Sequence, residues 1–166
     1  MRQSLYLLLG SNRGNRMEYI FKAEKLINEK LGNIEKKSSV YETAAWGNTQ
    51  QAKFLNKALK LTTNISPEGI LSIIKKIETD CGRVFTGKWN EREIDIDILL
   101  LGNLIFENEI LTIPHAMLHL RKFALAPLAE IAGNVEHPIL KKNISELLKN
   151  CSDSLGVNIF EPSNEL

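Results

Sequence analysis

The sequence predicts an α+β fold, in which a ferredoxin-like antiparallel sheet (βαββαβ) with helices on one face is followed by a hairpin and C-terminal helices. The first supporting observation is the order of the apolar patterns, which run strand, helix, strand, strand, helix, strand. Two strand–helix–strand halves of this kind suit an antiparallel sheet covered by helices. The second is length, because 166 residues without an internal repeat or a linker suit a single domain over residues 1–166.

The first half opens with an apolar run over residues 4–9, which predicts a buried strand that stops at a turn beginning with Gly10. The turn lacks the Gly-Lys-Ser/Thr of a P-loop, so a plain strand-to-helix turn is the favoured interpretation. A helix is expected over residues 16–31, because its apolar residues recur on one face and Gly32 follows as a C-terminal stop. Residues 34–43 are expected to form the second strand.

The second half follows a polar loop over residues 44–53. Residues 54–63 predict a strand with several leucines available for packing. The triplet at 66–68, Ser-Pro-Glu, combines a cap, a proline in the first turn and an acid near the positive end of the dipole. It predicts a helix that ends just before Gly82. A cation-rich loop then leads to an apolar strand over residues 94–101.

The rest of the chain is predicted to be mainly helical. Residues 104–106 and 110–113 suggest a small hairpin. A helix is expected over residues 120–132, where Pro127 must lie near the start or introduce a kink. A short helix is expected over residues 143–150, and the last residues are expected to be loosely held.

Composition restricts the classes of function. The hydrophobic fraction is 43%, the charged fraction 25% and the net charge +1, which does not indicate tight non-specific binding of nucleic acid. Cys81 and Cys151 have no metal-ligand spacing and fit a reducing compartment. The apolar start is too short to span a membrane. We therefore expect a cytoplasmic protein, a monomer by default, without membrane or nucleic-acid partners.

The most informative stretch contains Asp95 and Asp97, which alternate with isoleucines. Side chains alternate between the faces of a strand, so both carboxylates should point the same way, with Cα atoms about 6.5 to 7 Å apart. A shared Mg²⁺ would relieve their repulsion. The alternative is a surface strand whose acids bind nothing. The neighbouring cations favour a substrate with its own negative charge; they are Arg83, Lys88, Arg92, His115, His119 and Arg121.

The chain closely resembles the 6-hydroxymethyl-7,8-dihydropterin pyrophosphokinase family of folate biosynthesis. Each matching block is weak alone, but their order and spacing together are specific. The blocks are Leu8-Leu9-Gly10-Ser11-Asn12, Ser38-Ser39-Val40-Tyr41-Glu42-Thr43, Phe54-Leu55-Asn56, Ile77-Glu78 with Gly82-Arg83-Val84, Trp89-x-x-Arg92-x-x-Asp95-Ile96-Asp97, Leu111-Thr112-Ile113-Pro114-His115 and Arg121-x-Phe123-x-Leu125-x-Pro127-Leu128.

The resemblance implies a Mg²⁺-dependent diphosphotransferase. It transfers pyrophosphate from ATP to 6-hydroxymethyl-7,8-dihydropterin, and the products are AMP and the pterin diphosphate. Asp95 and Asp97 match the family's ligands of two Mg²⁺ ions, which arrive with ATP. Arg83 and Arg92 match catalytic loop arginines that contact the phosphates, although either could instead be a solvated loop residue.

The resemblance also implies two groups of substrate contacts. The ATP-binding positions are Glu78, Trp89, Arg92, Ile98, Thr112, His115 and Arg121. The pterin-binding positions are Thr43, Ala45, Trp46, Phe54, Asn56, Asp95 and Phe123. For some of these residues an ordinary role stays open, since His115 could simply end the hairpin and both phenylalanines could belong to the core.

The chain departs from the family pattern near the tryptophan, where Asn90 and Glu91 replace the usual small residue and proline. An extra acid so close to the phosphates could weaken nucleotide binding through repulsion. Two other functions compete with the kinase. A Mg²⁺-dependent phosphohydrolase or nuclease would need a further acid, for which Glu93 and Glu91 are available. A non-catalytic RNA-binding module is disfavoured by the near-neutral charge.

Overall fold

The structure, a computed structural model, describes residues 1–84, 87 and 90–162. Its elements in chain order are β1 (Gln3–Ser11), α1 (Arg16–Lys30), β2 (Ile34–Lys37), β3 (Tyr41–Thr43), β4 (Phe54–Thr63), α2 (Pro67–Asp80), β5 (Asp95–Leu101), β6 (Phe106–Glu107), β7 (Thr112–Ile113), the 3₁₀ turn η1 (Leu118–Leu120), α3 (Lys122–Ala132), α4 (Ile144–Lys149) and β8 (Val157–Ile159).

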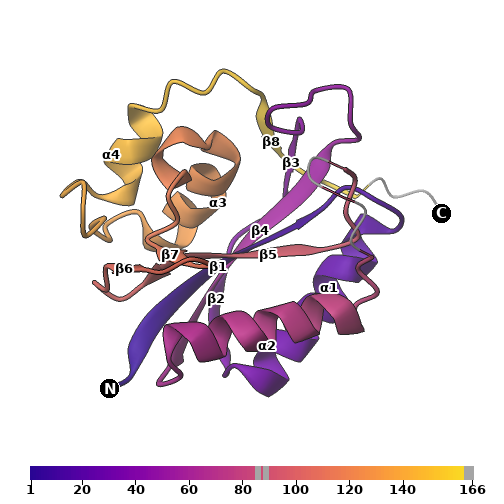
Figure 1. Cartoon of the computed structure of the whole chain (residues 1–166). Coiled ribbons are helices and arrows are strands. Elements are labelled where there is room, and N and C mark those ends of the chain that lie inside the picture. The colour runs from indigo at the N-terminus through magenta and orange to yellow at the C-terminus, as the bar shows by residue number, and fades with distance from the viewer. Residues whose placement is uncertain (85–86, 88–89, 163–166) are drawn as a thin grey trace.

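The centre of the fold is a six-stranded sheet in the order β5-β1-β4-β3-β8, with β2 also pairing with β4. Its pairings are antiparallel, and β1 lies between β4 and β5. Helices α1 and α2 cover one face, while α3 and α4 lie on the other (Figure 1). The predicted α+β, ferredoxin-like class is confirmed, and the C-terminal helices form a third layer over the opposite face.

Strand β1 divides its side chains between two hydrophobic cores. Leu5, Leu7 and Leu9 pack with α1 and α2, whereas Tyr6 and Leu8 pack with α3 and α4. This is the alternation expected of a strand with a helical layer on each side. The next residue on the second face is a glycine, and there the apolar packing gives way to a pocket.

Side-chain caps fix where the helices begin. The Asn15 carboxamide accepts a hydrogen bond from the Glu18 amide, and the Asn143 carboxamide accepts one from the Glu146 amide. Ser66 caps α2 in the same way, directly before Pro67. These caps satisfy amides that have no partner inside the helix. Among the helices within the described ranges, none is long and apolar enough to cross a bilayer.

The structure differs from the predicted elements in two places. Residues 34–43 form two strands instead of one, because the Ser38 hydroxyl accepts the Ala58 amide at 2.9 Å and interrupts the regular ladder. Pro127 lies well inside α3, which still runs continuously from Lys122 to Ala132.

The end of the chain also differs from its prediction. We expected the last residues to be loosely held, but Val157–Ile159 forms an edge strand against β3. Residues 163–166 lie outside the described residues.

Candidate active site

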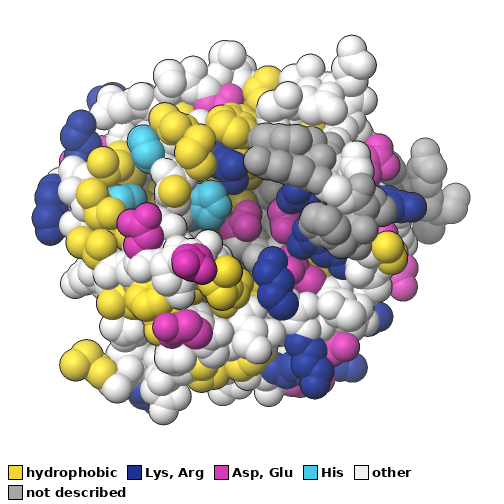
Figure 2. Space-filling model, viewed as in Figure 1, with side chains coloured by type: hydrophobic (Ala, Val, Ile, Leu, Met, Phe, Trp, Pro, Cys, Tyr) yellow, Lys and Arg dark blue, Asp and Glu magenta, His cyan; other side chains and the backbone are white. Residues whose placement is uncertain are grey.

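A pocket of about 200 Å³ lies where β1, β4 and β5 meet the start of α3. Polar, charged and aromatic side chains all line it. Figure 2 shows acidic and basic side chains gathered near the centre of this face, beside a hydrophobic area. The lining residues are Leu8, Gly10, Thr43, Ala44, Ala45, Trp46, Gln51, Phe54, Asn56, Asn90, Arg92, Asp95, Asp97, Arg121 and Phe123.

Asp95 and Asp97 both line this pocket, while Ile96 and Ile98 between and after them are buried in the opposite core. The strand alternation therefore acts as the sequence predicts. The two carboxylates stand on a strand whose backbone is held by its pairing with β1, where Gly10 lies opposite Asp95. Their position is therefore set by the sheet and not by a loop.

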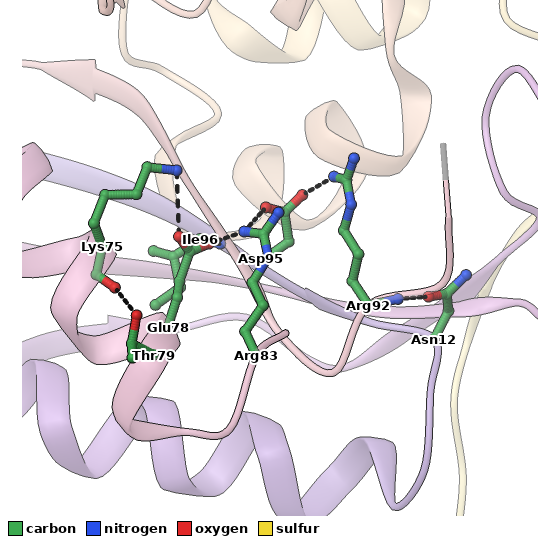
Figure 3. Close-up of polar contacts among 8 residues, drawn as sticks. All are labelled: Asn12, Lys75, Glu78, Thr79, Arg83, Arg92, Asp95 and Ile96. Atoms are coloured by element: carbon green, nitrogen blue, oxygen red, sulfur yellow. Dashed lines mark hydrogen bonds and ion pairs between the residues drawn. The ribbon is translucent and has the colours of Figure 1, made fainter. Parts of the chain in front are cut away.

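Asp95 lies at the centre of an ion-pair network (Figure 3). Arg83 donates to one of its oxygens at 3.1 Å, and Arg92 donates to the other at 2.7 Å. Arg83 also pairs with the buried Glu78 at 2.7 Å. The network brings arginines from both ends of the 83–92 loop to one carboxylate.

Glu78 connects this network to the sheet. Its carboxylate accepts the Ile96 amide of β5 at 2.9 Å and an ion pair from Lys75 at 3.3 Å. Burial, and then the nearby charge of Asp95, raise the pKa of Glu78 above its ordinary value. The hydrogen bond from Ile96 and the pair with Arg83 favour the charged form. Glu78 thus holds Arg83 beside Asp95 from the far side.

Asp97 has the more perturbed environment of the two aspartates. Burial and the charge of Asp95 raise its pKa from 3.8 to about 7, while Arg121 and Arg92 work in the opposite direction. A cation placed beside both aspartates would relieve this cost. In the part of the chain that the structure describes, no group of three His, Cys, Asp or Glu side chains could hold a metal. A cation at this pair would thus complete its shell with oxygens other than a third carboxylate, such as those of a substrate, of water or of neutral protein groups.

Strands β3 and β4 bring polar groups suited to the edge of a heterocycle to the pocket. The side-chain nitrogen of Asn56 donates to the Thr43 hydroxyl at 2.8 Å, and both side chains are buried. A Cβ at Gly10 would lie 3.0 Å from the Asn56 carbonyl oxygen and 3.5 Å from the Phe54 ring. Glycine at this position therefore leaves the space that Asn56 and Phe54 use.

Arg121 lies among aromatic side chains at the start of α3. Its guanidinium lies 4.8 Å from the Trp46 ring centroid and 5.7 Å from that of Phe123. Among the residues that the structure describes, none offers a hydrogen-bond acceptor to the buried Arg121 Nε atom. The guanidinium thus keeps a donor that a ligand with an acceptor could satisfy.

His115 is neutral in this environment. Burial and the charge of Arg121 lower its pKa to about 4. Its Nδ1 atom accepts the Met117 amide at 3.1 Å, so the proton of the neutral ring belongs on Nε2. His115 can therefore donate a hydrogen bond from Nε2 across the neutral pH range.

Asn12, at the end of β1, joins the two loops that flank the pocket. Its side-chain oxygen accepts the Arg92 amide at 2.7 Å, and its backbone amide donates to the Arg92 carbonyl at 3.0 Å. Its side-chain nitrogen donates to the Ala52 carbonyl at 3.0 Å. One buried side-chain carboxamide thus connects Arg92 to Ala52 in the 44–53 loop.

Comparison with known proteins identifies the architecture. Residues 6–133 match the model of the family described as 7,8-dihydro-6-hydroxymethylpterin-pyrophosphokinase (HPPK). The chain belongs to this family. It is 47% identical over 143 residues to the 2-amino-4-hydroxy-6-hydroxymethyldihydropteridine pyrophosphokinase of Aquifex aeolicus, covering 86% of this chain and 89% of the relative. The Bacillus subtilis enzyme of the same name is 39% identical over 137 residues, or 82% of each chain.

A solved structure shows the same fold at lower identity. A Plasmodium falciparum HPPK-DHPS crystal structure superposes with a TM-score of 0.71 at 17% identity, covering 90% of this chain. This chain spans 43% of that longer protein. The HPPK fold assigned from the sequence is therefore confirmed at the level of architecture.

The pocket brings together most residues that resemblance to the HPPK family assigned to substrates. All of the proposed pterin positions line it, and so do Arg92, Asp97 and Arg121. Glu78 and Arg83 lie behind Asp95 and reach the pocket through it. Trp89 lies outside the described residues.

Besides Glu78, three of the proposed ATP positions within the described residues do not line the pocket. The Ile98 side chain is buried in the core beneath α2, so only its backbone is left for a ligand. Thr112 lies in β7, opposite Glu107, and His115 follows that hairpin. Their roles toward nucleotide stay predictions.

Sequence reasoning did not assign site roles to Gly10, Asn12 or Gln51, although the first two lie within a block quoted for the resemblance. A signal for Gly10 and Asn12 was present, because they end the apolar strand that a βαββαβ sheet places beside the Asp95 strand. No pattern in the sequence indicates the approach of Gln51 to the pocket.

Proposed function

We propose which residues of the pocket bind the metal ions, the phosphates, the nucleotide and the pterin in the HPPK reaction. The chain is a pyrophosphokinase of folate synthesis, which transfers a pyrophosphoryl group from ATP to 6-hydroxymethyl-7,8-dihydropterin and releases AMP. The observation that carries the residue assignment is the pocket itself, where a pair of strand-borne carboxylates faces arginines and aromatic rings.

Asp95 and Asp97 are the proposed ligands of two Mg²⁺ ions. Both offer hard carboxylate oxygens on a rigid strand, and the raised pKa of Asp97 indicates a place where added positive charge is favourable. The aspartates alone cannot complete the coordination, which suits ions that arrive with the phosphates of ATP. When bound, these ions neutralise the charge that builds on the phosphate oxygens during transfer.

Arg83 and Arg92 are the proposed phosphate contacts. In the structure both pair with Asp95, so they lie where a triphosphate bound at that carboxylate would meet them. Guanidinium groups bind phosphate oxygens in the same forked geometry that they use with carboxylates. The arginines would exchange one anionic partner for another without travelling far. Glu78 holds Arg83 near the site during this exchange.

The nucleotide contacts also include His115 and Arg121 in this proposal. His115 is neutral and donates from Nε2, which suits an acceptor on the nucleotide. Arg121 lies at the boundary between the two substrates, since its face covers Trp46 and its charge acts on Asp97. Glu78, Trp89, Ile98 and Thr112 complete the proposed nucleotide set. The supporting observation for Ile98 is limited to its backbone, because its side chain is buried.

The pterin is proposed to bind between aromatic side chains in the opposite part of the pocket. Phe54 and Phe123 provide flat faces, and Asn56, fixed by Thr43, offers a carboxamide edge. Ala45 and Trp46 supply backbone groups at the same rim. This arrangement directs the hydroxymethyl group of the pterin toward Asp95 and Asp97, where the phosphates would lie.

The competing phosphohydrolase would need a third acid beside the pair. Glu93 is buried and pairs with Arg13 at 3.5 Å, while Glu91 is exposed. Neither belongs to a three-ligand group among the described residues. The proposal also takes the chain to be a cytoplasmic monomer that acts on small molecules only, without nucleic-acid or membrane partners. The net charge of +1 supports the absence of a nucleic-acid partner.

The deciding experiment is product identification. The chain is incubated with MgATP and the reduced pterin alcohol, and the products are separated and identified by mass spectrometry. AMP and the pterin diphosphate in equal amounts are expected. ADP, or phosphate released without any pterin, would contradict the proposal. Light scattering on the same preparation tests the monomer.

A further inference from the structure

Residues 151–160, which we call the C-terminal strap, line none of the pocket but contact the elements that form two of its sides. The strap leaves the end of α4, passes α3 and ends as β8 beside β3 (Figure 1). Helix α3 contacts both β3 and β8. Helix α3 carries Phe123, and β3 carries Thr43. The strap thus adds a connection between α3 and β3, two elements that also contact each other directly.

At α3 the strap supplies a cap that the helix lacks. Arg121, at the N-cap position, makes no side-chain capping bond. Asp153 takes this role, because one of its carboxylate oxygens accepts the Lys122 amide at 3.1 Å. Its other oxygen accepts the Leu155 amide at 3.0 Å and so orders the strap itself. Lys122 lies between two residues that border the pocket, so this bond holds both Arg121 and Phe123.

At the sheet the strap completes a strand that would otherwise be an exposed edge. Strand β3 has three residues, and β8 pairs with each of them, including Thr43 with Val157. The Phe160 amide then donates to the Val40 carbonyl at 2.8 Å, which extends the pairing past β3. With β4 on one side and β8 on the other, this short strand is paired along both edges. Thr43 is the hydroxyl that fixes Asn56.

The end of the strap also supports the 44–53 loop. The Arg16 guanidinium lies 5.6 Å from the Phe160 ring centroid. Arg16 donates to the Lys53 carbonyl at 2.9 Å and pairs with Glu42 of β3 at 2.9 Å. Phe160 therefore provides the surface against which Arg16 holds the base of the loop.

A second connection between α3 and β3 exists, but it lies farther from the pocket. Glu130 accepts hydrogen bonds from the Ser39 amide, the Ser39 hydroxyl and the Tyr41 hydroxyl, at 2.9, 2.8 and 2.5 Å. This connection is two helical turns away from Phe123. It keeps α3 on the sheet and leaves the start of the helix to be fixed by Asp153.

We propose that the C-terminal strap is a positioning element for the pterin, which sets the separation between Phe123 on α3 and Thr43 with Asn56 on the strands. The inference rests on the proposed pterin site. A flat ring bound between two sides of a pocket responds to their spacing, and a misplacement of about 1 Å can cost a large part of the rate. The Asp95 and Asp97 end of the pocket is built on β5, which lies at the opposite end of the sheet order from β8.

The test compares two shortened chains. One ends at Asp153 and lacks β8, and its matched control ends at Phe160 and keeps the whole strap. Asp153→Ala removes both hydrogen bonds of this carboxylate without shortening the chain, while Asp153→Asn keeps one oxygen that can accept the Lys122 amide and should rescue the helix cap. The apparent KM is measured for each substrate, because a general loss of stability would not change the KM for the pterin while leaving the KM for MgATP unchanged.

The chain ending at Asp153 and the Asp153→Ala variant should raise the KM for the pterin about ten-fold or more, and leave the KM for MgATP within about two-fold. The chain ending at Phe160 and Asp153→Asn should resemble the full chain. A pterin KM unchanged in the shorter chain, or equal increases for both substrates, would overturn the proposal.

A second measurement keeps the inference separate from the proposed function. Amide hydrogen exchange is compared between the two shortened chains without any substrate. Exchange should accelerate at residues 41–46 and 121–124 of the chain ending at Asp153, and stay unchanged in α1 and α2. Unchanged protection from exchange at residues 41–46 and 121–124 would overturn the proposed role of the strap, even if the full chain is inactive. A full chain that turns over no pterin would contradict the proposed function alone.

Discussion

The two faces of the sheet use the same strands but are closed differently. On one face, α1 with 15 residues and α2 with 14 cover Leu5, Leu7 and Leu9 completely. On the other, α3 with 11 residues and α4 with 6 cover Tyr6 and Leu8, and the cover ends at Gly10. The pocket occupies the part of the sheet that the shorter helices leave open.

The difference shows how a single strand can serve both stability and chemistry. Apart from the buried ion pair between Lys57 and Glu24, the core on the closed face is made of apolar residues that exclude water and contribute mainly to folding. Residues at the open end of the other face include carboxylates, an asparagine and a glycine that do little for a core. Their cost is visible in Asp97, whose charged form is disfavoured by its surroundings.

The largest expected effect is that of Asp97→Asn, which should lower activity about 1,000-fold through loss of a metal ligand. The pKa of Asp97 is about 7 in the folded chain against 3.8 ordinarily. The folded state therefore holds a proton that the unfolded state releases, and the wild-type free energy of unfolding falls as pH rises between these values. Asparagine does not titrate, so the variant should be more stable above pH 7 by roughly 2 kcal/mol.

Urea unfolding at pH 5 and pH 8 without Mg²⁺, together with AMP production, checks both halves of this prediction. Asp80→Asn is the control, because Asp80 is an exposed acid of α2 that pairs with Lys30. It should change neither activity nor the pH dependence. Equal stability of Asp97→Asn and wild type at pH 8 would show that the charge of Asp97 is not disfavoured.

On the closed face, Leu7→Ala should lower the free energy of unfolding by about 2 to 5 kcal/mol, because Leu7 is fully buried between the sheet and the helices. The KM values of the folded enzyme should not change. Leu7→Met keeps the volume and should cost less than about 1.5 kcal/mol. Denaturant unfolding measures the loss, and a substrate-specific increase in KM would mean that the faces are not independent.

One position from the open end provides the contrast. Gly10→Ala should raise the KM for the pterin about ten-fold, because the new Cβ would lie 3.0 Å from the Asn56 oxygen and must displace it. Stability should change by less than about 1 kcal/mol. Gly156→Ala is the matched control, since its Cβ would meet only Asn158 at 3.8 Å. Initial rates over a range of pterin concentrations decide, and an unchanged KM would contradict the assignment of Asn56.

The smallest effect is expected for Arg121→Lys. Lysine keeps the charge but loses the flat guanidinium that lies over Trp46 and Phe123, at a cost of about 1 kcal/mol. The ratio kcat/KM for the pterin should fall about five-fold. Lys122→Arg, one residue along, should have no effect. A rate equal to that of wild type would mean that the stacked arrangement contributes nothing to binding.

The features that sequence predicted well are those that short-range patterns determine. Strand β4 has the predicted bounds because its apolar residues and flanking polar loops are local signals. Helix α2 begins at its Ser66-Pro67 cap for the same reason. The aspartate pair lies on one side of its strand because alternation requires only local backbone geometry.

The features that sequence did not predict depend on distant partners. The break between β2 and β3 requires the Ser38 hydroxyl to meet Ala58 on another strand. Strand β8 has only three residues and forms only because β3 offers an edge. The Arg121 guanidinium packs on the ring of Trp46, which lies 75 positions earlier in the sequence, and no periodicity predicts such a contact.

The carboxamide of Asn12 couples the positions of two backbone segments beside the pocket. Its oxygen accepts the Arg92 amide and its nitrogen donates to the Ala52 carbonyl, so the positions of Arg92 and Ala52 are coupled. A movement of Arg92 or of Ala52 that breaks its bond to Asn12 leaves the oxygen or the nitrogen of this buried carboxamide without that partner, at a cost in free energy. Replacing Asn12 by aspartate would keep the acceptor and delete the donor, and so would separate two movements that a single functional group now links.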